Sequence, residues 1–303
     1  MEYKAFEEFC ISNKIEYKKN EPMKLHTSFK IGGEADYFVN VASENRLKSV
    51  IAEAKKLSIP YFVIGKGSNL LVSDKGIDGV VINLCGMDGI TVNGNEITAF
   101  AGASLASVCC KAQENCLTGL EFAYGIPASV GGALYMNAGA YGGEMSNVVT
   151  KATFVTDEGE SGKISVDDMA LGYRTSIFKG SRMIITSVTF SLEKGAKAEI
   201  KAKMEDFIGR RKSKQPLEYP SAGSTFKRPE GYFAGALIEQ NGLKGRSVGG
   251  AEVSQKHAGF VINKGNATCK DTKELIKIIK DTVFKNNGVA LETEVIFIGR
   301  EEK

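Results

Sequence analysis

The segment over residues 119–143, GLEFAYGIPASVGGALYMNAGAYGG, carries seven glycines in 25 residues and only one charged side chain. Glycine loses more backbone entropy on folding than any other residue, so such a cluster indicates turns, left-handed backbone or a close approach of main chain to a ligand. Large flat side chains interrupt the glycines, which a flexible linker would lack. The segment therefore predicts an ordered loop system that cradles a large, flat, phosphate-bearing cofactor.

A second glycine turn, GKGSNL over residues 65–70, directly follows a short apolar run. Successive main-chain N–H groups in such a turn can bind a pyrophosphate. The turn lacks the third glycine of the dinucleotide fingerprint and the Gly-Lys-Ser/Thr ending of a P-loop. Taken alone it is compatible with a plain β-turn, whereas two glycine turns together favour a grip on both ends of one diphosphate.

Composition excludes several functional classes. Hydrophobic residues make up 43% and charged residues 25% of the 303 residues, and the formal net charge is +3. Nucleic-acid-binding proteins usually carry a strongly basic face, and a net charge as small as +3 does not indicate one. No apolar run approaches the length of a membrane span, and the acidic N-terminus does not resemble a signal peptide. We therefore expect a cytoplasmic protein without nucleic-acid or membrane partners.

Cysteine and histidine usage predicts neither a disulfide framework nor a metal centre. No Cys-x-x-Cys pair occurs, and the chain has only two histidines, His26 and His257, which we expect to be structural. Reduced and mostly buried thiols are the usual state of such cysteines in a reducing compartment. The six are Cys10, Cys85, Cys109, Cys110, Cys116 and Cys269.

Hydrophobic spacing predicts helices and strands without strict alternation, which is typical of an α+β fold. Ser43 is expected to cap a helix that runs to residue 57, and Asp271 with Glu274 to form a capping box that starts a helix ending at Gly288. Further helices are expected over residues 1–20, 104–117, 196–212 and 233–240. Strands are expected from the Gly32-Gly33 turn to residue 41 and over residues 61–64, 69–72, 80–84, 90–92, 97–101, 148–156, 183–192, 259–263 and 291–299.

A domain boundary is expected near residue 200, where a helix with a basic end is followed by Pro216. This places one domain over residues 1–200, with subdomains of about 1–93 and 94–200. The second domain covers residues 201–303.

Five motifs resemble the MurB family, the UDP-N-acetylenolpyruvoylglucosamine reductases. They are GKGSNLLV, GLEFAYGIPASVGGALYMNAGAYGGE, YRTS, SAGSTFKRP and the closing LETEVIFIG, and their order and spacing match over residues 25–299. The resemblance implies a two-subdomain FAD-binding fold of the vanillyl-alcohol-oxidase (PCMH) type, followed by a C-terminal α+β substrate-binding domain. It also implies a monomeric, NADPH-dependent flavoenzyme of peptidoglycan synthesis, in the shorter class of the family.

The implied reaction is reduction of the enolpyruvyl ether of a UDP-sugar. Hydride from reduced FAD would add to the terminal vinyl carbon, negative charge would build on the substrate carboxylate, and the neighbouring carbon would take a proton. The family pattern assigns the proton donor to Ser224 in SAGSTF, a bidentate carboxylate clamp to Arg174 in YRTS, and a supporting acid to Glu294. A turn serine, a surface ion pair and a rim carboxylate are the alternatives.

The closing segment predicts a partly apolar setting for Glu294. Period-two alternation places Leu291, Thr293, Val295 and Phe297 on one face and Glu292, Glu294, Ile296 and Ile298 on the other. An ionised carboxylate beside a developing anion is unfavourable. We therefore expect Glu294 to be protonated when it acts, with its pKa raised by burial and by substrate charge.

The implied FAD-binding residues lie in and just after the two glycine turns. They are Gly65, Lys66, Gly67, Ser68, Asn69, Leu70, Gly125, Ile126, Ala128, Ser129, Gly131, Gly132, Asn137, Ala138 and Gly139. The family often has glycine at the place of Ala128, and alanine disfavours positive φ. This sequence therefore departs from the family pattern at Ala128, a position expected to bear on phosphate binding.

The expected substrate contacts are Tyr173, Lys214 and Lys227. Tyr173 could stack on substrate or flavin, with a core tyrosine as the alternative. The two lysines belong to short basic runs that could meet the UDP diphosphate or simply form a solvated helix end. Arg228 stands where family members often carry asparagine, so its nucleotide contact is in question.

Two other functions fit parts of the sequence. An oxidase of a small alcohol could share the flavin fold, but it would leave SAGSTFKRP unexplained and no cysteine or histidine stands out as a covalent flavin tether. A non-catalytic nucleotide-sugar-binding protein would use the glycine loops only structurally. Bound yellow flavin, bleached by NADPH and recoloured by substrate, separates the three.

Overall fold

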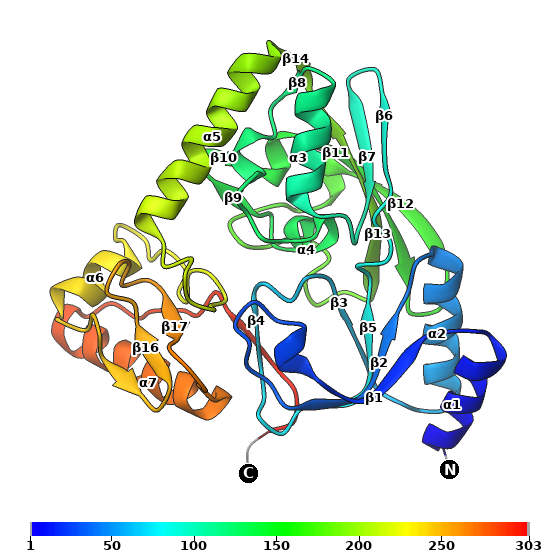
Figure 1. Ribbon diagram of the computed structural model, residues 1–303, viewed down its shortest axis with the longest axis horizontal. Helices are drawn as coiled ribbons and strands as arrows, with labels where there is room; N and C mark the ends of the chain where they lie inside the picture. The colour runs from blue at the N-terminus through cyan, green and yellow to red at the C-terminus, as the bar shows by residue number, and fades with distance from the viewer. Residues whose placement is uncertain (1, 302–303) are drawn as a thin grey trace. The chain divides into compact units, whose positions relative to one another are not determined.

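The computed structural model describes residues 2–301, and the chain forms two compact units (Figure 1). Unit 1 comprises Met1–Lys19, Tyr37–Lys66 and Gly79–Arg210. Unit 2 comprises Asn20–Asp36, Gly67–Asp78 and Arg211–Lys303. Two short N-terminal segments therefore belong with the C-terminal third of the chain, and the division at residue 200 stays a prediction.

A five-stranded antiparallel sheet forms the centre of unit 1, in the order β12-β11-β13-β7-β6. Its strands are β6 (Ile90–Asn93), β7 (Glu96–Phe100), β11 (Val149–Thr156), β12 (Ser161–Ser165) and β13 (Met183–Ser191). Helices α3 (Leu105–Glu114) and α4 (Val130–Tyr135) contact β7, and α4 also contacts β13. Ser104 caps α3 by accepting a hydrogen bond from the Ser107 N–H, so the predicted helix start is confirmed.

A second sheet has the order β1-β2-β5-β3. Its strands are β1 (Tyr17–Pro22), β2 (Glu34–Asn40), β3 (Tyr61–Ile64) and β5 (Ile77–Asn83), and helices α1 (Glu2–Ser12) and α2 (Glu44–Lys56) precede and follow β2. The predicted Ser43 cap of α2 is confirmed. The predicted helix over residues 1–20 is wrong beyond Ser12, because left-handed Lys14 (φ 52°) ends it and β1 follows.

Unit 2 contains a three-stranded antiparallel sheet, β15 (Ser247–Val248), β16 (Ala251–Val253) and β17 (Val261–Asn263), with α6 (Ala234–Gln240) and α7 (Cys269–Asn287) beside it (Figure 1). The predicted capping box at Asp271 and Glu274 is wrong by one turn. Thr268 is the N-cap and Asp271 is its partner at the third helical position. Left-handed Gly288 (φ 69°) ends α7 as predicted.

The remaining elements are one further helix and several short strands and 3-10 helices. Strand β4 (Leu70–Val72) pairs in parallel with β18 (Ile296–Ile298), and helix α5 (Lys197–Lys214) runs across the boundary between the units in the sequence. The others are β8 (Leu117–Thr118), β9 (Gly139–Ala140), β10 (Gly143–Glu144), β14 (Glu193–Lys194), η1 (Met23–Leu25), η2 (Glu121–Ala123), η3 (Met145–Asn147) and η4 (Val166–Asp168).

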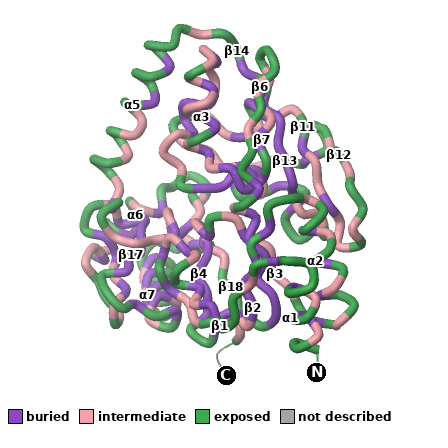
Figure 2. The backbone as a smooth tube through the Cα atoms, turned by 45° about the vertical axis from the view of Figure 1, so that its right-hand side comes forward, coloured by how far each residue is buried: buried purple, intermediate pink, exposed green. Residues whose placement is uncertain are grey.

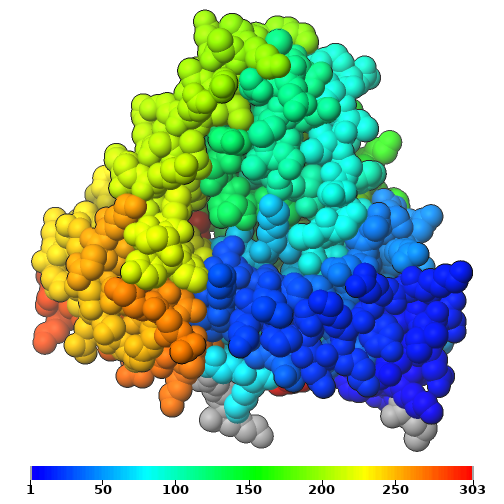
Figure 3. All heavy atoms as spheres, viewed as in Figure 1, coloured from blue at the N-terminus to red at the C-terminus, as the bar shows by residue number. Residues whose placement is uncertain are grey.

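Each unit has its own hydrophobic core, visible as purple stretches of the backbone in Figure 2. The core of unit 1 includes Val80, Ile97 and Val188, whereas that of unit 2 gathers Leu275 and Ile279 of α7. Residues 20–36 (blue) lie directly against the orange C-terminal segment in Figure 3, and the Asn263 side chain donates to the Phe29 carbonyl at 3.2 Å. Among residues 2–301, no helix combines the length and apolar character that crossing a bilayer requires.

Candidate functional site

The start of the first glycine turn packs on the second glycine turn within unit 1, which contains Gly65 and Ser129 but not Gly67 or the residues after it. A Cβ atom placed on Gly65 would lie 2.0 Å from Ser129 Oγ, so only glycine allows this contact. Ser129 is buried, caps α4, and accepts a hydrogen bond from the Gly132 N–H. The first turn therefore packs directly on the serine that starts the helix of the second.

The rest of the first turn presents unused donors. In residues 2–301, the main-chain N–H groups of Gly67, Ser68 and Asn69 donate no hydrogen bond to the protein. Three consecutive free N–H groups in a tight turn are the donor set that binds a phosphate or pyrophosphate. The residues present thus fit the diphosphate of a dinucleotide cofactor.

Ala128 fits its position without strain. Its φ is not positive, and its carbonyl accepts a hydrogen bond from the Leu105 N–H at 3.1 Å. At Gly131, close packing rather than backbone conformation requires glycine, because a Cβ atom there would lie 2.8 Å from Ala101 Cβ. The alanine that departs from the family pattern therefore leaves the turn unstrained.

Tyr173 and Arg174 occupy the corner of a tight turn in unit 1. Gly172 and Thr175 exchange two main-chain hydrogen bonds of 3.2 Å, and Arg174 adopts the left-handed region with φ 56°. The Arg174 guanidinium lies 5.1 Å from the centre of the Tyr173 ring, which is 52% exposed. The exposed ring excludes the alternative of a core tyrosine, and Arg174 is partly exposed.

This turn is tied to the glycine-rich segment by two side chains. Asn137 is fully buried; its amide donates to the Gly172 carbonyl at 3.1 Å and its oxygen accepts from the Ser146 N–H at 3.0 Å. The Ser176 hydroxyl donates to the Tyr135 carbonyl at 2.8 Å. These tethers could not be predicted from the sequence, because no local pattern links residues that lie 35 and 41 positions apart.

Unit 2 brings the segment of Ser224 beside that of Glu294. The Glu294 N–H donates to the Thr225 carbonyl at 2.9 Å, and Phe226 pairs with Thr293. Thr225 is itself fixed, since its N–H donates to the Gly259 carbonyl at 2.8 Å and its hydroxyl accepts from the Val261 N–H at 2.9 Å. Ser224 is partly exposed next to this buried anchor.

The closing segment is less regular than predicted. Regular pairing starts only at Ile296, so the prediction of a strand over residues 291–299 is wrong for its first half. Leu291 and Val295 are buried, but Phe297 is 39% exposed, so it does not share their setting. Glu294 is partly buried. The strand prediction fails before Ile296 because single bridges and loop contacts, rather than a continuous β ladder, hold this part of the chain.

The predicted diphosphate contacts have partners or lie in solvent. Lys227 Nζ donates to Glu292 Oε2 at 2.8 Å. Lys214 ends α5 and is exposed. The Arg228 guanidinium lies 4.1 Å from the centre of the Phe233 ring, which is 61% exposed.

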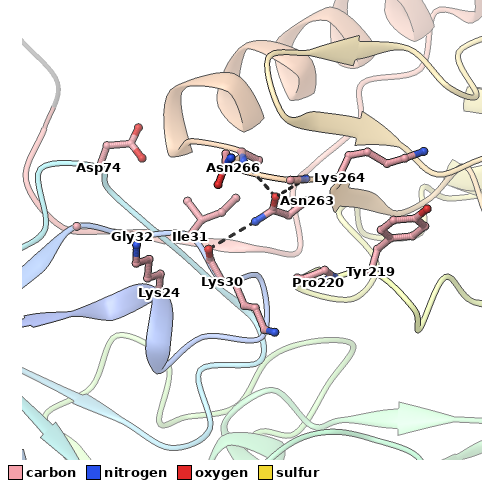
Figure 4. Close-up of a pocket in the computed structure, with 13 residues that line it drawn as sticks. Lys24, Lys30, Ile31, Gly32, Asp74, Tyr219, Pro220, Asn263, Lys264 and Asn266 are labelled. Atoms are coloured by element: carbon pink, nitrogen blue, oxygen red, sulfur yellow. Dashed lines mark hydrogen bonds between the residues drawn. The ribbon is translucent and has the colours of Figure 1, made fainter.

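A cavity of about 580 Å³ in unit 2 is separate from these residues (Figure 4). Asn263 crosses it to the main chain of residues 29 and 30, and the ammonium groups of Lys30 and Lys264 point in different directions. Neither Ser224 nor Glu294 lines it. Among residues 2–301 no group of acidic, cysteine or histidine side chains has the geometry of a metal site.

The comparisons with known proteins bear on both halves of the chain. Residues 35–165 match the FAD binding domain family, and residues 215–298 match the family described as UDP-N-acetylenolpyruvoylglucosamine reductase, C-terminal domain. The UDP-N-acetylenolpyruvoylglucosamine reductase of Clostridium kluyveri is 51% identical over 98% of this chain and 99% of its own length. The chain belongs to this reductase family. The Bacillus cereus reductase 2 is 49% identical over 94% of both chains.

Solved structures agree with that assignment. The MurB reductase of Thermus caldophilus superposes with a TM-score of 0.79 at 34% identity, over 93% of this chain and 98% of that one. A berberine bridge enzyme variant matches 63% of this chain and 44% of its own, with a TM-score of 0.51 at 14% identity, which shows the fold alone. The predicted reductase family, FAD-binding fold and C-terminal domain are confirmed.

All of the predicted FAD-binding residues lie inside the FAD-binding match, and Ser224 and Glu294 lie inside the C-terminal match. Arg174 lies between the two matched ranges. The individual roles of these residues stay predictions, and they form the basis of the proposal that follows.

Proposed function

We propose that this flavoenzyme reduces the enolpyruvyl ether of UDP-N-acetylglucosamine to UDP-N-acetylmuramate, with Ser224, Arg174 and Glu294 as its catalytic residues. The proposal rests on the family to which the chain belongs. The single observation that supports it most is the hydrogen bond of 2.9 Å from the Glu294 N–H to the Thr225 carbonyl. That bond holds the supporting acid beside the segment of the proton donor.

Bound FAD would supply the hydride in this reaction. The first glycine turn would hold the diphosphate through the free N–H groups of Gly67, Ser68 and Asn69. Ser129, at the start of α4, would support the second turn. The other predicted cofactor residues lie in these two turns or directly after the second.

Arg174 would bind the substrate carboxylate. A guanidinium keeps its charge at any physiological pH and matches a carboxylate with two parallel N–H donors. Arg174 lies at a turn corner beside the exposed ring of Tyr173 and is itself partly exposed. Negative charge that builds on the carboxylate during the reaction strengthens this pairing, which is how the clamp would lower the barrier.

Ser224 would then donate its hydroxyl proton to the carbon next to the carboxylate. A hydroxyl is a weak acid, but the carboxylate-derived anion is a strong base, so the transfer is feasible. Glu294, protonated, would stabilise the same anion without like-charge repulsion. Tyr173, Lys214 and Lys227 would contribute to binding the UDP-sugar.

The proposal includes the hydride source, the oligomeric state and the compartment. NADPH would be the external reductant for the bound FAD. The enzyme works as a monomer in the cytoplasm, where the six cysteines, none of them disulfide-bonded in the structure, would stay reduced. Its product serves peptidoglycan synthesis, and through it cell-wall formation, cell shape and cell division.

Stopped-flow absorbance of the flavin tests the proposal in two half-reactions. NADPH should bleach the wild-type enzyme and the UDP-sugar enol ether should recolour it. In Ser224→Ala, bleaching should be unchanged while recolouring slows by a factor of at least a hundred, because only the second half-reaction needs the proton.

Ser221→Ala is the matched control. Ser221 belongs to the same hexapeptide and accepts a hydrogen bond from the Gly223 N–H at 3.4 Å, so its loss reports general disturbance of the loop. Recolouring should change by less than threefold. Equal slowing of both half-reactions in Ser224→Ala would mean that Ser224 only shapes the site. A colourless purified protein would favour the non-catalytic alternative.

A further inference from the structure

Asn69 belongs to the glycine turn, yet its side chain is bonded to a segment 225 residues away. Its Nδ2 donates to the Glu294 carbonyl at 3.0 Å. Its own carbonyl accepts from the Ile296 N–H at 3.0 Å. Asn69, Glu294 and Ile296 all lie in unit 2. The side-chain amide is therefore engaged by the protein, while the Asn69 main-chain N–H is among the free donors of the turn.

Both main-chain groups of Glu294 are consequently held. Its N–H donates to Thr225, next to Ser224, and its carbonyl accepts from Asn69. Regular β pairing starts only at Ile296, so no continuous ladder fixes the backbone at Glu294. These two hydrogen bonds set the peptide planes on either side of its Cα, and those planes set the direction of the Cα–Cβ bond from which the carboxyl group extends.

We propose that Asn69 is a positioning residue for Glu294: its side-chain amide, in the turn that holds the cofactor diphosphate, fixes the acid relative to Ser224. This inference rests on the proposed catalytic role of Glu294. It assigns the Asn69 side chain to the acid and only the Asn69 main chain to the cofactor. Asn69 thereby couples the position of the glycine turn to the position of Glu294.

The chemistry at this position favours an amide. The group that faces the Glu294 carbonyl must donate a hydrogen bond, and the Asn69 amide does so at the right length without a charge. Aspartate has nearly the same shape but offers only acceptors when ionised, so it would repel the carbonyl. Alanine leaves the carbonyl without this donor.

The test compares Asn69→Ala and Asn69→Asp with wild type in the two half-reactions of the full-length flavoenzyme. Both half-reactions are measured per bound flavin, and recolouring should slow several-fold more than bleaching by NADPH. Recolouring by the UDP-sugar enol ether should slow about tenfold in Asn69→Ala, because a less well placed acid stabilises the transition state less. Asn69→Asp should slow it at least as much, although its volume is unchanged.

Asn241→Ala is the matched control, because Asn241 makes the same kind of bond, Nδ2 to the Leu237 carbonyl at 2.8 Å, at the end of α6 in the same unit. It should leave both half-reactions within twofold of wild type. A circular-dichroism melt of every variant identifies losses that come from unfolding.

A double-mutant cycle with Glu294→Gln gives a readout that a merely structural role would not move. If Asn69 acts through Glu294, Asn69→Ala should add less than twofold in the Glu294→Gln background. The pH dependence of recolouring should also shift in Asn69→Ala and vanish in Glu294→Gln.

Two outcomes would overturn the inference: full additivity in the cycle, or equal slowing of bleaching and recolouring per bound flavin. Failure of the proposed function has a different signature, since the wild-type flavin would then not be recoloured by the enol ether at all.

Discussion

Asn137 in unit 1 and Asn69 in unit 2 make the same kind of hydrogen bond, but they differ in burial and in the number of bonds that their side chains make. Each lies in a predicted cofactor segment, and each donates its side-chain amide to the main chain of a predicted catalytic segment. Asn137 is fully buried, has φ 40°, and also accepts from the Ser146 N–H. Asn69 is partly exposed and uses its amide donor alone.

The difference follows from the segments that they hold. The corner carrying Arg174 is an isolated tight turn, whose shape depends on two long main-chain bonds and on the buried tether. Glu294 lies between a paired residue, Thr293, and a short parallel ladder. The turn at Arg174 therefore depends on the buried amide for its shape. The backbone at Glu294 is already held on both sides, and the Asn69 amide only fixes the orientation of its carbonyl. Function and stability should separate at Asn69 and should be lost together at Asn137.

Removing Arg174 should give the largest effect on rate. Arg174→Ala should slow recolouring by a factor on the order of a hundred or more, because the developing carboxylate charge loses its donor. Arg174→Lys keeps the charge but not the planar fork, so it should recover only part of that loss. Stopped-flow absorbance measures both, with Arg182→Ala, at an exposed ion pair, as the control. A fully active lysine variant would show that charge alone suffices.

Asn137→Ala should give the largest effect on stability. It leaves the Ser146 N–H and the Gly172 carbonyl without their side-chain partner, and places alanine at a left-handed position that asparagine tolerates better. The expected loss is about 3 kcal/mol of unfolding free energy, from about 1–3 kcal/mol for each group left unpaired.

Urea denaturation measures this loss, and Asn69→Ala, with about 1 kcal/mol expected, is the partner variant in the comparison. Arg174-dependent recolouring should fall in the Asn137 variant as well, even below its unfolding range. Equal and small losses of stability in both variants would remove the distinction between the two asparagines.

Most helices and strands could be predicted from residues close together in the sequence, but the side-chain bonds of Asn69 and Asn137 could not. Ser43, Ser104 and Gly288 were found because capping depends on residues within one turn. The cap of α7 was misplaced because Asp271 and Glu274 also satisfy the spacing rule, while the Asp74 carboxylate, distant in sequence, bonds the Cys269 N–H in the structure.

The candidate site shows the same limit. Motifs located the glycine turns, Ser224, Arg174 and Glu294 through resemblance to the family, and the predicted reductase was confirmed. What each asparagine bonds could not be read from the sequence, since the partners lie 35 and 225 positions away. Strand β1 was missed because its YKKNEP sequence has one buried position and no alternating apolar pattern.

Mild acid should loosen unit 2 at His257, which lies in that unit. Burial, which disfavours the charged ring, lowers the pKa of His257 from its ordinary value of 6.5, and Lys244 acts in the same direction. The unfolded chain then takes up the proton more readily than the folded one. The stability that neutral His257 contributes is present above about pH 6.5 and is lost as the pH falls towards the lower folded value.

Hydrogen exchange of the Gly259 N–H, which His257 Nδ1 accepts at 3.1 Å, should report this loosening between pH 7 and about 5.5. Because amide exchange itself depends on pH, the comparison is with His257→Gln at each pH. The glutamine variant should remove the extra acid response without changing unit 1 amides such as that of Ala133. The same acid response in both proteins would assign it to carboxylates instead.

Releasing Lys227 should give the smallest effect and should act on substrate binding alone. Lys227 bonds the 74%-exposed side chain of Glu292, and an exposed ion pair contributes only about 0.2–1 kcal/mol. If Lys227 meets the UDP diphosphate, Glu292→Gln should lower the KM for the UDP-sugar by less than about fivefold and leave kcat unchanged. Lys227→Ala should raise KM, and adding Glu292→Gln to it should produce no further change. A KM for Glu292→Gln equal to that of wild type, with Lys227→Ala also silent, would leave Lys227 with a purely structural pairing on the rim of unit 2.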